Sequence, residues 1–163
     1  KADIMSDVFG RFYNYEDAMN ACPEGWRLPT DKEWTALCKT INEDVDAEAV
    51  HEVIPGVAAK LMTDASFNEV RMWDYWPEVG EITNESGLSM IPTGFANLGD
   101  IDASGNYPAA SFSGVYEYAA FWADADDEND TPTCRYLFCD QTELFSYQAD
   151  TLTFGASVRC IMK

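Results

Sequence analysis

A helix start in residues 22–38, CPEGWRLPTDKEWTALC, constrains the fold more than any other stretch. Thr30 and Glu33 have the spacing of a capping box, in which the Thr hydroxyl and the Glu carboxylate each accept a hydrogen bond from a backbone amide of the first turn. Between Asp31 and about Ile41, apolar residues then recur with helical spacing. We therefore expect a capped amphipathic helix that packs on the core. Its apolar face consists of Trp34, Leu37, Cys38 and Ile41.

In the rest of the chain, helical patterns come first and short strands follow. Asn14 is the expected N-cap of a first helix, which Pro23 ends, and residues 47–54 are expected to form a third short helix. Strands are expected at residues 89–96, 114–123, 133–138, 144–148 and 156–162, with turn-rich or acidic loops at 98–108 and 124–132. Helices followed by strands predict an α+β fold, and loops this long are the expected binding surface.

The net charge of −19, from 29 acidic and 10 basic residues, argues against two classes of partner. Nucleic acids are bound by clustered Lys and Arg that neutralise phosphates, and so are anionic membrane surfaces. No run of about 18 apolar residues occurs, so the sequence predicts no transmembrane segment. The common role of such acidity is solubility, and the alternative is a cation or a basic partner.

Five cysteines and one histidine limit the covalent and metal chemistry that we expect. The cysteine content is typical of an exported protein with one or two disulfides. With no C-x-x-C pair and a single His51, the sequence argues against a zinc site. His51 has acidic neighbours, and we expect an exposed surface histidine rather than a catalytic one.

Two segments carry a resemblance to a known family. The run GRFYNYEDAMNACPEGWRLPTDKEW and the C-terminal GASVRCIMK resemble the opening and the closing strand of the Fibrobacter succinogenes major paralogous domain, a family of bacterial surface and secreted proteins. The resemblance implies a C-type-lectin-like fold, with N-terminal helices packed on short, mostly antiparallel strands, and one domain over residues 1–163. It also implies an extracellular or cell-surface location, including a lipoprotein that is anchored upstream of Lys1.

The same resemblance bears on the cysteines. It implies a disulfide between Cys22, after the first helix, and Cys160, in the last strand. Cys134 and Cys139 have a C-x4-C spacing that is similar to the copper-binding pair of formylglycine-generating enzymes, and thiolates are soft ligands that suit Cu(I). A copper oxidase is therefore an alternative to the structural interpretation, in which one of the two is bridged to Cys38 or both are buried.

Two acidic loops are the candidates for calcium. Asp100 and Asp102 are spaced like the start of an EF-hand loop, but the twelfth position is Ser111, and we expect a plain turn. Asp124 and Asp126 begin an acidic run that is more often a solvated loop. The Glu-Pro-Asn and Trp-Asn-Asp motifs of calcium-dependent lectins do not occur. We expect no metal cofactor, with calcium as the weaker alternative.

Aromatic side chains are the expected ligand contacts, because flat apolar rings stack on sugar faces. The candidates are Tyr75, Trp76 and Tyr107. Tryptophans at positions that look like core in the family are expected to be buried, and they are Trp26, Trp34, Trp73 and Trp122.

Three hypotheses for function follow. The first is a non-catalytic surface or secreted domain that binds a glycan or a protein ligand through its long loops. The second is the copper-dependent oxidase that uses Cys134 and Cys139. The third is a structural fimbrial or adhesin subunit that recognises other subunits.

Overall fold

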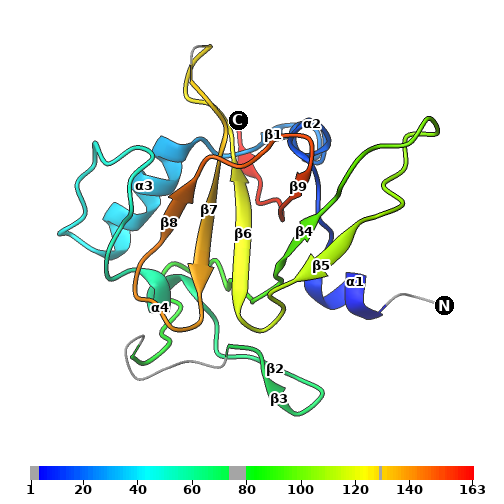
Figure 1. The fold of residues 1–163 in the computed structure, drawn as a ribbon. Coiled ribbons are helices and arrows are strands. Elements are labelled where there is room, and N and C mark those ends of the chain that lie inside the picture. Colours follow the sequence, from blue (N-terminus) through cyan, green and yellow to red (C-terminus); the bar gives the residue numbers. More distant parts are fainter. Residues whose placement is uncertain (1–3, 74–79, 129) are drawn as a thin grey trace.

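The computed structural model describes residues 4–73, 80–128 and 130–163, and a three-stranded antiparallel sheet lies at its centre (Figure 1). The strands are arranged in the order β6-β7-β8, where β6 is Tyr118–Ala123, β7 is Thr133–Phe138 and β8 is Phe145–Tyr147. β6 and β7 pair along their whole length, so the strand predicted at 133–138 is confirmed. The acidic loop 124–132 connects these two strands.

Three smaller sheets surround the central one, and all are antiparallel. One has the order β5-β4-β9, one pairs β1 with β10, and one pairs β2 with β3. Their bounds are β1 Trp26–Arg27, β2 Ser66–Phe67, β3 Val70–Arg71, β4 Phe95–Asn97, β5 Ser111–Ser113, β9 Phe154–Gly155 and β10 Ile161–Met162. Short helices and small antiparallel sheets give the α+β arrangement that the order of patterns predicts.

The helices are short, and two of them start where the sequence marks a cap. α3 spans Asp31–Ile41 and has the complete capping box, with Glu33 N donating to Thr30 Oγ1 and Thr30 N donating to Glu33. α2 spans Tyr15–Met19 and is capped by Asn14, as expected. The other two helices are α1, Ile4–Phe9, and α4, Ala58–Leu61.

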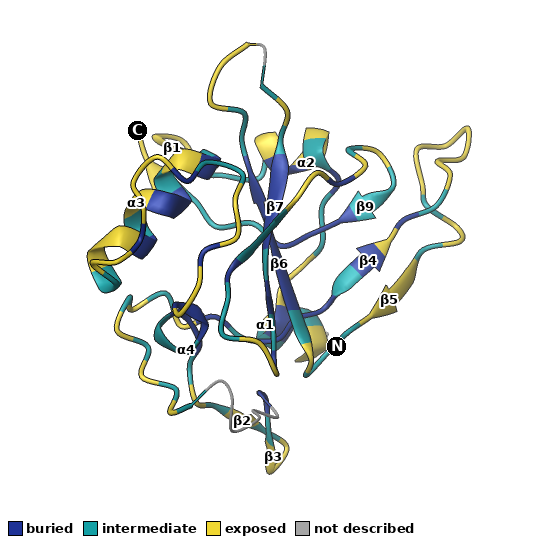
Figure 2. Cartoon of the chain, turned by 60° about the vertical axis from the view of Figure 1, so that its left-hand side comes forward, coloured by how far each residue is buried: buried dark blue, intermediate teal, exposed yellow. Residues whose placement is uncertain are grey.

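Both faces of β6 and β7 are largely buried, and each face has its own hydrophobic cluster (Figure 2). Successive residues of a strand point to opposite faces, so Ala119, Phe121 and Ala123 of β6 belong to the larger cluster, which α3 and α4 cover. Ala120 and Trp122 belong to the smaller cluster, which includes Ala18 of α2 and Leu28. The central sheet therefore lies between two hydrophobic clusters.

The disulfide between Cys22 and Cys160 is present, as the resemblance implied. The two Cα atoms are 5.8 Å apart, and the bridge spans 138 residues of sequence. It lies next to the β1–β10 pair, in which Trp26 lies opposite Met162. The bridge and the strand pair together hold the C-terminal segment against the entry to α3.

Residues 47–54 do not form the expected third helix; they form a series of turns. Asp46 Oδ1 accepts a hydrogen bond from Glu48 N, 3.0 Å away, and Thr35 Oγ1 donates to Ala49 O at 2.8 Å. His51 then adopts a left-handed backbone with φ of 61°. These contacts satisfy the backbone locally, and the apolar spacing alone could not reveal them.

The expectation for one of the four tryptophans is also wrong. Trp34, Trp73 and Trp122 are buried, but Trp26 is 40% exposed. It lies in the two-residue strand β1, whose only described partner is the equally short β10 at the C-terminus. No layer covers that outer face among the described residues. The sequence also did not predict α1, α4, the β2–β3 hairpin, β5 or β9. β4 is shorter than the strand expected at 89–96, and only residues 161–162 of the strand expected at 156–162 form one, β10.

Replacing Cys22 and Cys160 together by serine should lower the free energy of unfolding by about 2–5 kcal/mol, because the unfolded chain regains a long unconstrained loop. The measurement is urea unfolding with and without the two substitutions. The matched control is the unchanged protein unfolded with and without a reductant, which breaks the same bridge without changing a side chain. An unchanged unfolding midpoint for the double variant would contradict a stabilising bridge.

Glu33 should make the fold sensitive to acid. Its pKa is held below the ordinary value chiefly by hydrogen bonds from the Arg27 guanidinium, 2.7 Å away, with further help from Thr30 N. Because the folded pKa is the lower one, the stabilisation is complete above the unfolded pKa and is lost as the pH falls through the folded pKa. Glu33→Gln should cost about 0.5–1 kcal/mol at neutral pH, since solvent screens this partly exposed pair, and it should flatten the acid limb of stability. Exposed Glu24→Gln is the control, and equal pH profiles for all three proteins would refute the assignment.

Candidate functional site

Tyr107 lies at the edge of a hollow between the β4–β5 loop and α2. The hollow has a volume of about 470 Å³, within the range of small-ligand sites. Its lining combines one aromatic ring, one amide, three carboxylates and apolar side chains. The residues are Asn14, Glu16, Asp17, Asp100, Ile101, Tyr107, Leu152 and Thr153, with Gly99 and Gly105. Two of the residues singled out from the sequence, Tyr107 and Asp100, therefore come together.

Asn14 fixes the position of Tyr107. Its Nδ2 donates to the Tyr107 hydroxyl at 2.5 Å, and its Oδ1 accepts from Asp17 N at 2.7 Å as the cap of α2. Asn14 is only 7% exposed, so this amide is held firmly by its surroundings. One buried side chain thus connects the start of a helix to the candidate ligand contact on a loop 93 residues away.

The loop that carries Tyr107 is held by its own turn. Asp102 Oδ1 accepts hydrogen bonds from Ser104 N at 2.8 Å and from Asn106 N at 2.9 Å. One oxygen of the Asp102 carboxylate is therefore used to close the loop tip. Asp100 faces the hollow instead. The two aspartates that resembled calcium ligands in the sequence have different roles in this loop.

A second, mostly apolar hollow of about 620 Å³ also has Tyr107 in its lining. Phe9, Phe12 and Phe112 line it, and the Phe12 and Phe112 rings lie 5.8 Å apart. Phe112 is 65% exposed, although it belongs to strand β5. Tyr107 therefore lines both an acidic hollow and a mostly apolar one.

The two other aromatic candidates, Tyr75 and Trp76, lie outside the described residues.

The two cysteines of the C-x4-C pair, Cys134 and Cys139, both lie within the described residues. Cys134 belongs to the smaller hydrophobic cluster and Cys139 to the larger one, on opposite sides of the sheet. Burial raises the pKa of the Cys134 thiol well above its usual value, and burial likewise raises that of Cys38 to about 12. Burial thus favours the thiol over the thiolate that binds metal, which fits the structural interpretation of the cysteines.

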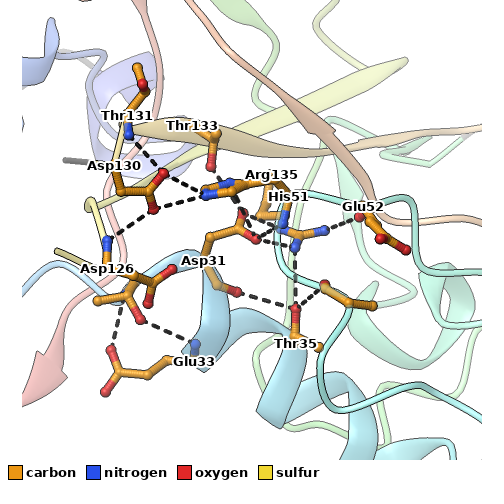
Figure 3. Close-up of polar contacts among 12 residues, drawn as sticks. Asp31, Glu33, Thr35, His51, Glu52, Asp126, Asp130, Thr131, Thr133 and Arg135 are labelled. Carbon is orange, nitrogen blue, oxygen red and sulfur yellow. Dashed lines mark hydrogen bonds and ion pairs between the residues drawn. The ribbon is translucent and has the colours of Figure 1, made fainter.

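A buried ion pair joins α3 to the middle of β7, and the sequence analysis missed it (Figure 3). Asp31 and Arg135 are both fully buried. Arg135 Nε donates to Asp31 Oδ1 at 2.7 Å, and its Nη2 donates to the other carboxylate oxygen. Thr133 Oγ1 donates to Asp31 Oδ1 at 2.9 Å, and Arg135 Nη1 donates to Glu52 O at 2.6 Å. An arginine in the mostly apolar strand TCRYLF was the signal in the sequence, because a buried charge requires a partner.

His51 lies beside this pair and is not the exposed surface residue that we expected. Its side chain is 32% exposed, and its backbone N donates to Asp31 Oδ2 at 2.5 Å. Its Nε2 faces the Asp130 carboxylate, with distances of 2.9 and 2.8 Å to the two oxygens. Asp124, by contrast, accepts hydrogen bonds from the Tyr15 hydroxyl and from Ala125 N. The acidic loop 124–132 is thus anchored at both ends rather than fully solvated.

Asp31→Asn should lower the free energy of unfolding by about 3–5 kcal/mol, because it leaves the buried Arg135 guanidinium without a compensating charge. The measurement is a double-mutant cycle with Arg135→Met, whose combined loss should be smaller than the sum of the single losses. Asp44→Asn, in the exposed connector after α3, is the matched control. Additive losses, or a single-variant loss as small as that of the control, would contradict the pair's role.

Comparison with known proteins identifies the family. The family model of the Fibrobacter succinogenes major domain matches residues 1–162. No curated protein and no solved structure matches the chain. Within residues 4–73, 80–128 and 130–163, none of the helices has the length and apolar character that a membrane crossing requires. The chain belongs to the Fibrobacter succinogenes major domain family.

Proposed function

We propose that the chain is a non-catalytic binding domain of a surface or secreted protein and that it binds a neutral glycan at the acidic hollow beside Tyr107. A C-type-lectin-like architecture, in which long loops carry the ligand site, is part of this proposal. The observation that carries it is the Tyr107 ring, held by Asn14 at the edge of a hollow lined with carboxylates. Aromatic rings stack on the apolar faces of sugars, and carboxylates accept hydrogen bonds from sugar hydroxyls.

Pre-organisation supports the proposal. The hydrogen bond from Asn14 and the closed turn at Asp102 order the Tyr107 side chain and its loop before any ligand arrives. A ligand therefore does not bear the full entropic cost of ordering them. The Tyr107 ring is half-buried, which leaves part of it accessible.

Charge supports a neutral ligand. Glu16, Asp17 and Asp100 line the hollow, and the whole chain carries −19. Sulfated or uronic-acid glycans would bring like charge to this surface, which is unfavourable. The location outside the cytoplasm is supported by the Cys22–Cys160 disulfide, since such bonds persist in oxidising compartments.

Tyr107→Ala should weaken binding to neutral oligosaccharides at least tenfold, equivalent to about 1.4 kcal/mol, because the stacking surface is lost. The measurement is a glycan array followed by calorimetry on the strongest ligand. Tyr107→Phe keeps the ring and removes only the hydrogen bond from Asn14, so it should lose less.

Tyr147→Ala is the matched control, because Tyr147 is 52% exposed on β8 and does not line the hollow. It should bind like the unchanged chain. An array without any neutral glycan ligand would overturn the proposal, and so would equal binding by the Tyr107→Ala and Tyr147→Ala variants.

A further inference from the structure

Three side chains of types that can ligate a metal meet where the acidic loop 124–132 contacts the turns that follow α3 (Figure 3). They are His51, Asp126 and Asp130, and one ligand atom of each lies within 4.8 Å of the others. His51 and Asp130 are 79 residues apart in sequence, so folding alone brings them together. This position is separate from the Tyr107 hollow, with which it shares no residue.

The histidine has carboxylates on both sides of its ring. Nε2 lies 2.8 Å from Asp130 Oδ2, and Nδ1 lies 3.6 Å from Asp31 Oδ2. Nδ1 is buried, and within the described residues it has no hydrogen-bond partner. In metal sites, a ligating imidazole turns one nitrogen to the metal and the other to a carboxylate, which fixes the tautomer and orients the ring. Asp31 lies on the Nδ1 side of the ring, and a small shift of the imidazole would bring Nδ1 from 3.6 Å into hydrogen-bond distance for this second role.

The carboxylate behind His51 is itself immobilised. Asp31 is fully buried and paired with Arg135, so it cannot move to follow the imidazole. The His51 backbone N also donates to Asp31 Oδ2, which ties the main chain to the same carboxylate. A plain solvated acidic loop does not require a buried ion pair behind a histidine. The arrangement therefore resembles a supported ligand set rather than a chance cluster of surface charges.

We propose that His51, Asp126 and Asp130 bind a divalent transition-metal ion, with Zn²⁺ as the representative. Imidazole nitrogen suits Zn²⁺ and its neighbours in the first transition row, whereas Ca²⁺ takes oxygen ligands. One neutral imidazole and two carboxylates compensate the double charge of the ion. Three protein ligands also leave a coordination position for water or for a group of a bound molecule. The single histidine of the sequence argued against zinc, but only the fold shows that two distant carboxylates complete the set.

The ion would join two segments that no regular secondary structure connects. His51 lies in the turns after α3, and both aspartates lie in the loop between β6 and β7. Binding should therefore stabilise the folded chain, because the unfolded chain does not bring these ligands together.

The decisive measurement uses the only histidine of the chain, whose imidazole gives a single set of ring signals in NMR spectra. Titrating the complete 163-residue protein with Zn²⁺ should shift these signals and reach saturation at one equivalent. The thermal unfolding midpoint should rise in the same titration. Imidazole signals that stay unchanged in excess Zn²⁺ would overturn the proposal, and this test requires no variant that has to fold.

Substitutions then test the carboxylates. Asp130→Asn and Asp126→Asn should each weaken Zn²⁺ binding at least tenfold by calorimetry, since each removes a charged ligand. Asp100→Asn and Asp102→Asn, in the other acidic loop, are the matched controls for Zn²⁺ binding. Their Zn²⁺ affinity should equal that of the unchanged chain. Visible spectra with Co²⁺ should lack thiolate bands, which separates this site from the cysteines. Losses that are equal in both loops, or thiolate bands, would show binding elsewhere and refute the assignment.

Discussion

The buried pair of Asp31 and Arg135 is the interaction on which the rest of the structure depends. Removing two charges from solvent costs free energy, and only close geometry and full hydrogen bonding offset that cost. Thr133 and the Glu52 carbonyl complete the hydrogen bonding of this pair. Asp31 is also the first residue of α3, where the helix dipole favours a negative charge. The same carboxylate thus fixes the helix start, the middle strand of the sheet and the turn that carries His51.

What the sequence predicted well is what local chemistry determines. The capping box at Thr30 and Glu33 predicted the start of α3, because its hydrogen bonds lie within four residues. The strand at 133–138 was predicted to the residue, since both of its ends adjoin turn-forming sequence. The Cys22–Cys160 bridge came from the family resemblance alone. The helix expected at 47–54 failed because side chains of Thr35 and Asp46 compete for its backbone groups.

The candidate sites required contacts between distant residues, which one sequence does not contain. Tyr107 could be singled out by its chemistry, but its partner Asn14 looked like a helix cap and nothing more. Asp126 was predicted to be an acidic loop residue, whereas His51, which lies near it in the fold, was expected to be an exposed surface histidine. The spacing of Cys134 and Cys139 drew attention to a strand whose most informative residue is Arg135, between them.

The disulfide has a mechanical consequence when the chain is pulled from its two ends. A pulling force that enters the chain before Cys22 and leaves it after Cys160 passes through the sulfur–sulfur bond, so the 138-residue span between them carries almost no load. Only the segments outside the bridge can be drawn out, including α1 and the Tyr13–Ala156 backbone pairing. The central sheet would keep its shape under such a force, whereas both hollows beside Tyr107 would lose a wall, because Asn14 and α1 lie before Cys22.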